Sequence, residues 1–172
     1  ISILNDFIKP TISVPENIIV EAKGGLTAVN IGNAMAYDES GILSLTNNAP
    51  EKFPLGISTI IWTAIDGSGN MAIAPQSITV NDSTPPEISP LPKIRGEAKS
   101  LTQNTIDIGI PSVRDFVGIS SIENNAPEVF PLGETIVTWT ATDQSGNTAS
   151  TTQLITVVDT TSPEFLTPSN IL

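Results

Sequence analysis

The sequence of 172 residues contains no cysteine and no histidine. The lack of cysteine excludes disulfides, zinc–thiolate sites and thiol nucleophiles, and leaves the redox compartment open. The lack of histidine removes the commonest general base and the commonest transition-metal ligand. The usual equipment of an enzyme is therefore missing, although a pair of carboxylates could still serve a glycosidase.

Basic side chains are scarce. The chain has 7 Lys and Arg against 18 Asp and Glu, which gives a formal net charge of −11 and a pI of about 4.1. Phosphate binding needs clusters of Lys and Arg, so nucleic acid is excluded as a partner. No apolar run approaches the ~18 residues of a membrane span, so this fragment contains no predicted transmembrane segment.

β-Branched residues are abundant, with 24 Ile and 20 Thr. Both residue types favour the pleated surface of a sheet. The 14 Pro and 12 Gly are enough to separate many short strands. No stretch shows a convincing apolar period of 3.6 residues, so the composition predicts an all-β fold.

The chain repeats itself with an offset of 77 residues. The segment NNAPEKFPLG at 47–56 returns as NNAPEVFPLG at 124–133, and WTAIDGSGN at 62–70 returns as WTATDQSGN at 139–147. A match at such an offset indicates tandem modules. The alignment predicts a piece of a longer array, divided as follows: a last-strand stub of a preceding repeat (1–5), a first repeat (6–80), a second repeat (81–158) and the start of a third repeat (159–172).

Short strands can be placed within each repeat. In the first repeat we expect strands at 12–22 (broken by Pro15), 27–31, 42–46 and 59–65, with a last strand that ends at Val80. Six or seven short strands in ~77 residues are typical of an immunoglobulin-like sandwich. The predicted fold class is therefore all-β, as tandem immunoglobulin-like β-sandwiches arranged end to end.

Alternation of side chains decides the expected place of the two tryptophans. Val137, Trp139 and Ala141 face one side of their strand, while the intervening residues face the other. This period of two predicts Trp62 and Trp139 as core residues. The alternative is an exposed Trp that stacks on a sugar ring.

Two motifs carry a family resemblance. The pattern DSTPP at 82–86 and the pattern WTATDQSGN at 139–147 resemble the hyalin repeat (HYR), an extracellular immunoglobulin-like module. The resemblance implies a role in adhesion or surface architecture, and a location outside the cell or on its surface. Animal members often carry a Cys pair that joins the first and last strands. The absence of Cys here implies a prokaryotic relative whose stability depends on packing or on ions.

Acidic residues recur at one predicted end of each sandwich. The chain entry and two loops meet at that end, and each copy places three aspartates and one asparagine there. The predicted metal ligands are Asp6, Asp38, Asp66 and Asn70 in the first copy, and Asp82, Asp115, Asp143 and Asn147 in the second. Ca²⁺ takes about 6–8 oxygen ligands and would remove the repulsion between the carboxylates, whereas Mg²⁺ fits less well. The pattern predicts Ca²⁺ as a cofactor that stiffens the repeat junctions.

Two other readings of these residues stay open. Asp and Asn are common in turns, where the side chain accepts hydrogen bonds from nearby backbone N–H groups as an Asx-turn. In the second copy, Arg114 could itself offset the charge of Asp115.

The repeated NNAPE-x-FPLG motif also has two interpretations. It could present Glu51 and Glu128 to a partner, or it could form an ordered turn in which Phe53 and Phe130 plug the sandwich. Paired Pro and Gly mainly fix turns, which favours the structural interpretation.

Two classes of function remain. The first is a non-catalytic structural repeat module of a large extracellular or cell-surface protein, such as an adhesin, sheath, surface layer or filament. Its expected partners are neighbouring repeats or copies of the same protein, and the chain ends (1–5 and 159–172) are expected to pack against an adjacent copy. The alternative is a glycan- or protein-binding accessory module of a secreted enzyme. A glycan binder should show a row of exposed aromatics, and the chain has only five Phe, two Trp and one Tyr.

Overall fold

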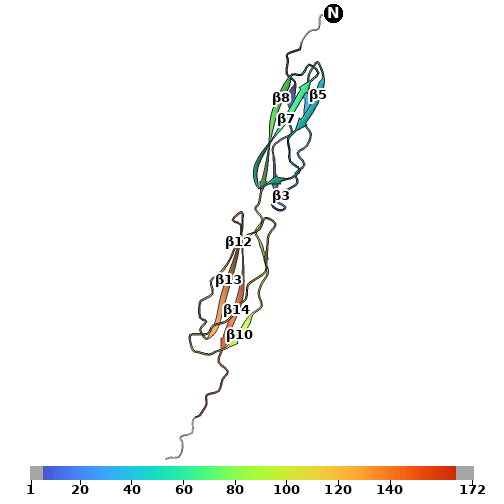
Figure 1. The fold of residues 1–172 in the computed structure, drawn as a ribbon. Helices are drawn as coiled ribbons and strands as arrows, with labels where there is room; N and C mark the ends of the chain where they lie inside the picture. The colour runs from blue at the N-terminus through green and yellow to red at the C-terminus, as the bar shows by residue number, and fades with distance from the viewer. Residues whose placement is uncertain (1–5, 166–172) are drawn as a thin grey trace, which may run out of the picture. The chain divides into compact units, whose positions relative to one another are not determined.

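Strands make up all the regular secondary structure in the computed structural model, which describes residues 6–165 (Figure 1). This confirms the predicted all-β class. Within residues 6–165 there is no helix long and apolar enough to cross a membrane. Of the chain ends predicted to pack against an adjacent copy (1–5 and 159–172), residues 1–5 and 166–172 lie outside the described residues.

The described chain divides into two compact units. The first extends to Thr84 and includes Phe116–Gly118, and the second comprises Pro85–Asp115 and the chain from Ile119 onward. The strands of the first unit are β1 (Thr11–Ser13), β2 (Ile18–Glu21), β3 (Leu26–Thr27), β4 (Met35–Tyr37), β5 (Ile42–Asn47), β6 (Phe53–Pro54), β7 (Gly56–Asp66) and β8 (Met71–Asn81). Those of the second are β9 (Glu87–Ile88), β10 (Ile94–Glu97), β11 (Val113–Arg114), β12 (Ile119–Asn124), β13 (Gly133–Asp143) and β14 (Thr148–Val158).

A four-stranded sheet dominates the first repeat, in the order β2-β8-β7-β5. β7 and β8 form a long antiparallel hairpin, whereas β2 runs parallel to β8. Two small antiparallel pairs, β1-β4 and β3-β6, complete the sandwich. The expected break at Pro15 is confirmed, because β1 ends at Ser13 and β2 begins at Ile18.

The core of each repeat contains its tryptophan. Trp62 is 5% exposed and Trp139 is 3% exposed, which confirms that both are core residues. Phe53 and Phe130 are also buried and belong to the same apolar clusters. The structural interpretation of the two NNAPE-x-FPLG turns is therefore confirmed for their phenylalanines.

One predicted strand is much shorter than expected. The strand predicted at 27–31 is reduced to β3 (Leu26–Thr27), although Val29 and Ile31 still pack on the core. The carbonyl of Ile31 accepts a hydrogen bond from the side chain of Gln76 (3.1 Å) instead of joining a ladder. The chain then bends at Gly32, whose φ is 76°. The strand β4, which pairs with β1, was not predicted.

The second repeat has the same arrangement, with the sheet order β10-β14-β13-β12 and the pair β9-β11. β10 again runs parallel to the last strand, β14. A single bridge between Asn104 and Phe130 stands where β3 pairs with β6 in the first repeat. Both repeats are immunoglobulin-like β-sandwiches, as predicted.

A buried glutamine in each repeat satisfies the indole of the tryptophan, which sequence reasoning missed. Trp62 Nε1 donates to Gln76 Oε1 (3.0 Å), and Gln76 Nε2 donates to the carbonyls of Glu16 (2.9 Å) and Ile31 (3.1 Å). Trp139 and Gln153 make the same bond (3.1 Å) in the second repeat. A single side chain thus links the hairpin to the connection between β1 and β2 and to the segment after β3.

Candidate metal centre

The turn between β7 and β8 orients the central aspartate of the first site. Asp66 Oδ1 accepts hydrogen bonds from the backbone N–H groups of Ser68 (2.9 Å) and Asn70 (2.8 Å). Asp66 Oδ2 accepts a third bond from the side-chain amide of Asn70 (2.8 Å). Gly69 sits at φ 90°, a conformation that favours glycine. The repeated D-x-SGN sequence is therefore a closed turn that holds one carboxylate.

The second repeat builds the same turn. Asp143 Oδ1 accepts from the backbone of Ser145 (2.8 Å) and Asn147 (2.8 Å), and Asp143 Oδ2 accepts from the Asn147 side chain (2.8 Å). Gly146 has a φ of 90°, as in the first copy.

Both central aspartates are buried, at 0% exposure for Asp66 and 1% for Asp143. Burial favours the neutral acid, but the hydrogen bonds to each carboxylate outweigh it. Asn70 and its neighbours thereby hold the pKa of Asp66 below its ordinary value, and Asn147 and its neighbours lower the pKa of Asp143 in the same way. Each turn thus stabilises a buried negative charge.

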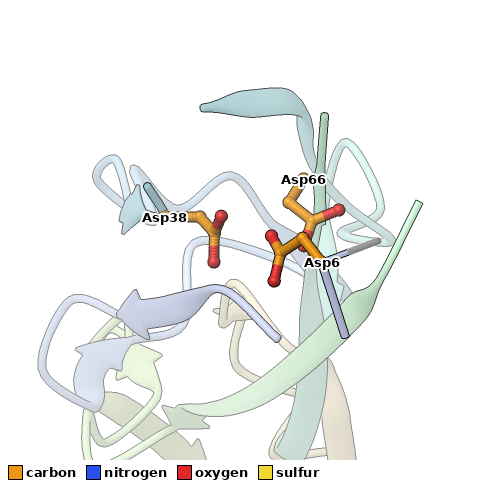
Figure 2. A group of neighbouring side chains, drawn as sticks. All are labelled: Asp6, Asp38 and Asp66. Carbon is orange, nitrogen blue, oxygen red and sulfur yellow. The ribbon is translucent and has the colours of Figure 1, made fainter. Parts of the chain in front are cut away.

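Two further aspartates of the first site come from separate segments, one before β1 and one after β4. Asp6 Oδ1 accepts from the backbone of Ile8 (2.9 Å), and Asp38 Oδ1 accepts from both the backbone (2.8 Å) and hydroxyl (2.7 Å) of Ser40. The Asx-turn reading therefore holds for all three aspartates of this repeat. Figure 2 shows their carboxylates turned toward one another.

The aspartates nevertheless gather as expected for a metal site. One carboxylate oxygen each from Asp6, Asp38 and Asp66 lies within 4.8 Å of the others. Asp82, Asp115 and Asp143 meet the same limit. Oxygens that bind one Ca²⁺ at about 2.3–2.6 Å lie at most about 5 Å apart, so this spacing suits a shared ion. The turn and cluster interpretations are compatible, because a carboxylate can cap a turn and still present an oxygen.

Asn70 contacts its neighbours in the site through its amide nitrogen. We predicted that its amide oxygen is a ligand, but its amide nitrogen is the atom that contacts Asp66 Oδ2 and the carbonyl of Asp6 (3.0 Å). In this orientation Asn70 positions two members of the cluster. Ligand roles for Asn70 and Asn147 stay predictions.

The side chain of Arg114 pairs with Glu87. Its Nε and Nη2 donate to the two carboxylate oxygens of Glu87 (2.9 and 3.3 Å) across the β9-β11 pair. That Arg114 also offsets the charge of the neighbouring Asp115 stays a prediction.

A second acidic element was missed by sequence reasoning. Glu21, at the end of β2, accepts hydrogen bonds from the backbone of Ser83 (2.7 Å) and from the hydroxyls of Ser83 (3.0 Å) and Thr84 (2.8 Å). These bonds lower the pKa of Glu21. We call this the glutamate clamp, because it ties the segment after β8 to the end of β2.

The glutamate clamp recurs in the second repeat. Glu97, at the end of β10, accepts from the backbone (2.6 Å) and hydroxyl (2.8 Å) of Thr160 and from the hydroxyl of Thr161 (3.1 Å). An alignment of the two repeats contains a sign of this clamp, because Glu21 aligns with Glu97 and Ser83-Thr84 aligns with Thr160-Thr161.

Comparison with known proteins agrees with this architecture. Residues 81–157 match the HYR domain. Hyalin from Lytechinus variegatus is 33% identical over 190 residues, which cover 97% of this chain. Residues 81–157 belong to the hyalin repeat family. This confirms the resemblance noted in the sequence, while the expected prokaryotic origin stays a prediction.

The hyalin repeats of this chain have other relatives. Hyalin from Strongylocentrotus purpuratus is 32% identical over 97% of the chain. A rat protein with sushi, von Willebrand factor type A, EGF and pentraxin domains is 32% identical over 85% of it. The chain spans 34%, 15% and 4% of the lengths of these three relatives. It is an extracellular or cell-surface repeat module of adhesion type.

Among solved structures, Drosophila N-cadherin EC1-4 matches 88% of the chain with a TM-score of 0.41 and 14% identity. Fibronectin(III)-like modules of Clostridium thermocellum CbhA match 93% with a TM-score of 0.35 and 11% identity. Both scores are too low to bear on function.

Proposed function

We propose that these hyalin repeats form a non-catalytic structural module of a larger surface protein and that each repeat binds one Ca²⁺. The observation that carries the proposal is the gathering of three aspartate oxygens within 4.8 Å, twice, at matching places in the two copies. Three carboxylates at this spacing repel one another, and a divalent cation offsets the repulsion.

The donor chemistry favours Ca²⁺. The candidate ligands are carboxylates, which hard cations prefer over nitrogen or sulfur donors. Backbone carbonyls or water would complete the shell, and the variable geometry of Ca²⁺ accepts such a mixture. Asp82 lies just before β9 in the sequence, so an ion held there would tie this segment to the second repeat and stiffen it.

Thermal unfolding in Ca²⁺ and in EDTA tests the proposal. A ligand that binds only the folded state adds about 2.7 kcal/mol at a hundredfold excess over its Kd. We expect Ca²⁺ to raise the melting temperature of both repeats. Asp38→Asn should abolish the effect in the first repeat and leave the second unchanged.

Asp107→Asn is the matched control. Asp107 also caps a turn, through the backbone of Gly109 (3.0 Å), but it belongs to neither aspartate group. Equal melting temperatures in Ca²⁺ and EDTA would contradict the metal proposal and leave only the turn-forming role.

The alternative, an accessory module of a secreted enzyme that binds glycan or protein, stays a prediction. A glycan array carried out with and without Ca²⁺ would distinguish it from the structural module.

A further inference from the structure

The glutamate clamp holds the chain on both sides of a candidate metal ligand. Asp82 lies between the end of β8 and the clamped pair Ser83-Thr84. Before it, Asn81 pairs with Glu21 in the β2-β8 ladder, and the Asn81 carbonyl accepts a hydrogen bond from the backbone of Ala22 (2.6 Å). After it, the backbone N–H of the clamped serine donates to Glu21 (2.7 Å). The backbone of Asp82 is therefore anchored at both ends to the end of β2.

Thr84 connects the clamp to the carboxylate of Asp82 itself. The hydroxyl of Thr84 donates to Glu21 Oε1 (2.8 Å), and its backbone N–H donates to Asp82 Oδ1 (3.3 Å). Glu21 thus fixes the residue that orients the carboxylate, in addition to the backbone that carries it. Both the place and the direction of the Asp82 side chain depend on these bonds.

The same construction recurs at the end of the second repeat. Val158 pairs with Glu97 in the β10-β14 ladder, and the Val158 carbonyl accepts from the backbone of Ala98 (2.7 Å). The hydroxyl of Thr161 donates to Glu97 Oε1 (3.1 Å), and its backbone N–H donates to Asp159 Oδ1 (3.1 Å). Within residues 6–165, Asp159 belongs to neither aspartate group. The chain therefore contains one clamp beside an aspartate group and one matching clamp without such a group.

The first site shows that the turn after this aspartate closes without hydroxyl groups. Asp6, which corresponds to Asp82, is followed by Phe7 and Ile8. The backbone of Ile8 still donates to Asp6 Oδ1 (2.9 Å). The turn at Asp82 therefore needs neither a serine nor a threonine, and the hydroxyls at positions 83 and 84 serve the contact with Glu21.

We propose that Glu21 is a positioning residue for the second Ca²⁺ site, and that its clamp holds Asp82 in the place and direction in which this side chain binds the ion. The inference rests on the proposed function, since it requires that Asp82 and the two other aspartates of its group share a Ca²⁺. Glu21 belongs to neither aspartate group, so it acts through Asp82 and not as a ligand. A ligand that is already held loses less conformational entropy on binding, which raises the affinity of the site.

Calorimetric titration with Ca²⁺ tests the proposal in an Asp38→Asn background, where only the second site is expected to bind. Glu21→Ala should raise the Kd of that site by about fivefold or more, since the backbone of about one residue then has to be ordered on binding. Thr84→Val removes the link to Asp82 without a change of charge and should also raise the Kd. Both positions are exposed, so the melting temperature in EDTA should stay near that of the background chain.

Glu97→Ala and Thr161→Val are the matched controls. They remove the same bonds beside Asp159, which belongs to neither aspartate group, and should leave the Kd of the second site unchanged. In the reverse background, Asp115→Asn, only the first site is expected to bind. There Glu21→Ala should leave the Kd unchanged, which separates positioning of Asp82 from a general loss of folding.

Failure of this inference is distinguishable from failure of the proposed function. An Asp38→Asn chain that binds Ca²⁺ with the same Kd after Glu21→Ala overturns the positioning role and leaves the metal site standing. An effect of Glu21→Ala that is absent in Thr84→Val, or that is equalled by Glu97→Ala, is an effect of charge and overturns the positioning role too. A parent chain that takes up no Ca²⁺ overturns both proposals.

Discussion

The two repeats share their buried interactions and differ on their surfaces. Both have the Trp–Gln bond, the closed Asp–Asn turn and the glutamate clamp. They differ on the outer face of the main sheet, which is rich in isoleucine in one and in threonine in the other. They also differ in one cross-strand pair, Thr11 opposite Tyr37 in the first repeat and Glu87 opposite Arg114 in the second. The shared features therefore define the fold and the candidate site, while the surface is free to specialise.

The largest expected effect comes from removing a shared buried group. Gln76→Ala leaves the Trp62 indole and two carbonyls without their partner, and each buried unsatisfied group costs about 1–3 kcal/mol. We expect the first repeat to lose about 3 kcal/mol in its free energy of unfolding, and Gln153→Ala to do the same in the second.

Urea denaturation followed by tryptophan fluorescence measures both losses, because each repeat has one Trp. Gln103→Ala, at an exposed glutamine, is the control and should change little. A loss confined to one of the two glutamine variants would show that the shared bond is not equally important in both repeats.

A smaller effect is expected where the turns differ. Gly67 of the first repeat is replaced by Gln144 in the second. A Cβ at position 67 would lie 2.5 Å from the backbone oxygen of Ser40, in the loop that carries Asp38. Gly67→Gln should therefore displace this loop, cost about 1–3 kcal/mol and weaken Ca²⁺ binding at the first site.

Calorimetry and Ca²⁺ titration of the Gly67→Gln chain check this prediction. Gly25→Gln is the control, because a Cβ there meets nothing within 4 Å. Unchanged Ca²⁺ binding by Gly67→Gln would show that the loop adapts without moving its aspartate.

The smallest expected effect is the loss of stability of the two repeats at acidic pH. The pKa values of Asp66 and Asp143 lie below the ordinary value of about 3.9 in the folded chain. The stability that each ionised carboxylate contributes is present above that value and is lost as pH falls through the folded pKa. In EDTA, the melting temperature of both repeats should therefore fall below about pH 4.

Asp66→Asn should flatten this fall in the first repeat only, and Asp143→Asn in the second only. Glu51→Gln, in an exposed turn, should leave both profiles unchanged. Melting curves between about pH 2 and pH 6 give the comparison. A profile that is unchanged in Asp66→Asn would place the acid sensitivity elsewhere.

Local pattern predicted the parts of this fold that depend on local chemistry. The alternation around Trp139 predicted the core, and the D-x-SGN sequence predicted the turn that carries Asp66. The gathering of Asp6 and Asp38 beside it followed from the known order of strands in an immunoglobulin-like sandwich, not from spacing alone.

Contacts between distant residues escaped prediction. Gln76 acts through carbonyls 60 and 45 residues away, and Glu21 acts through Ser83, 62 residues away. The periodicity of a single strand does not reveal such distant partners. The sequence sign of the Trp–Gln contact is its spacing, because the Gln follows the Trp by 14 residues in both repeats. The prediction of a strand over 27–31 was wrong for a related reason. The carbonyl of Ile31 accepts a hydrogen bond from the Gln76 side chain instead of from a neighbouring strand.

The parallel pairing of β2 with β8 has a mechanical consequence. When tension is applied to the two ends of a repeat, the early strand β2 is drawn toward its N-terminus and the last strand β8 toward its C-terminus. The two strands run in the same direction, so the load acts along them, and their ladder hydrogen bonds are sheared together instead of opened one at a time. The glutamate clamp lies at the end of this ladder and adds its bonds to the same line of force. A repeat joined in this way resists stretching most strongly along the direction in which its own chain continues.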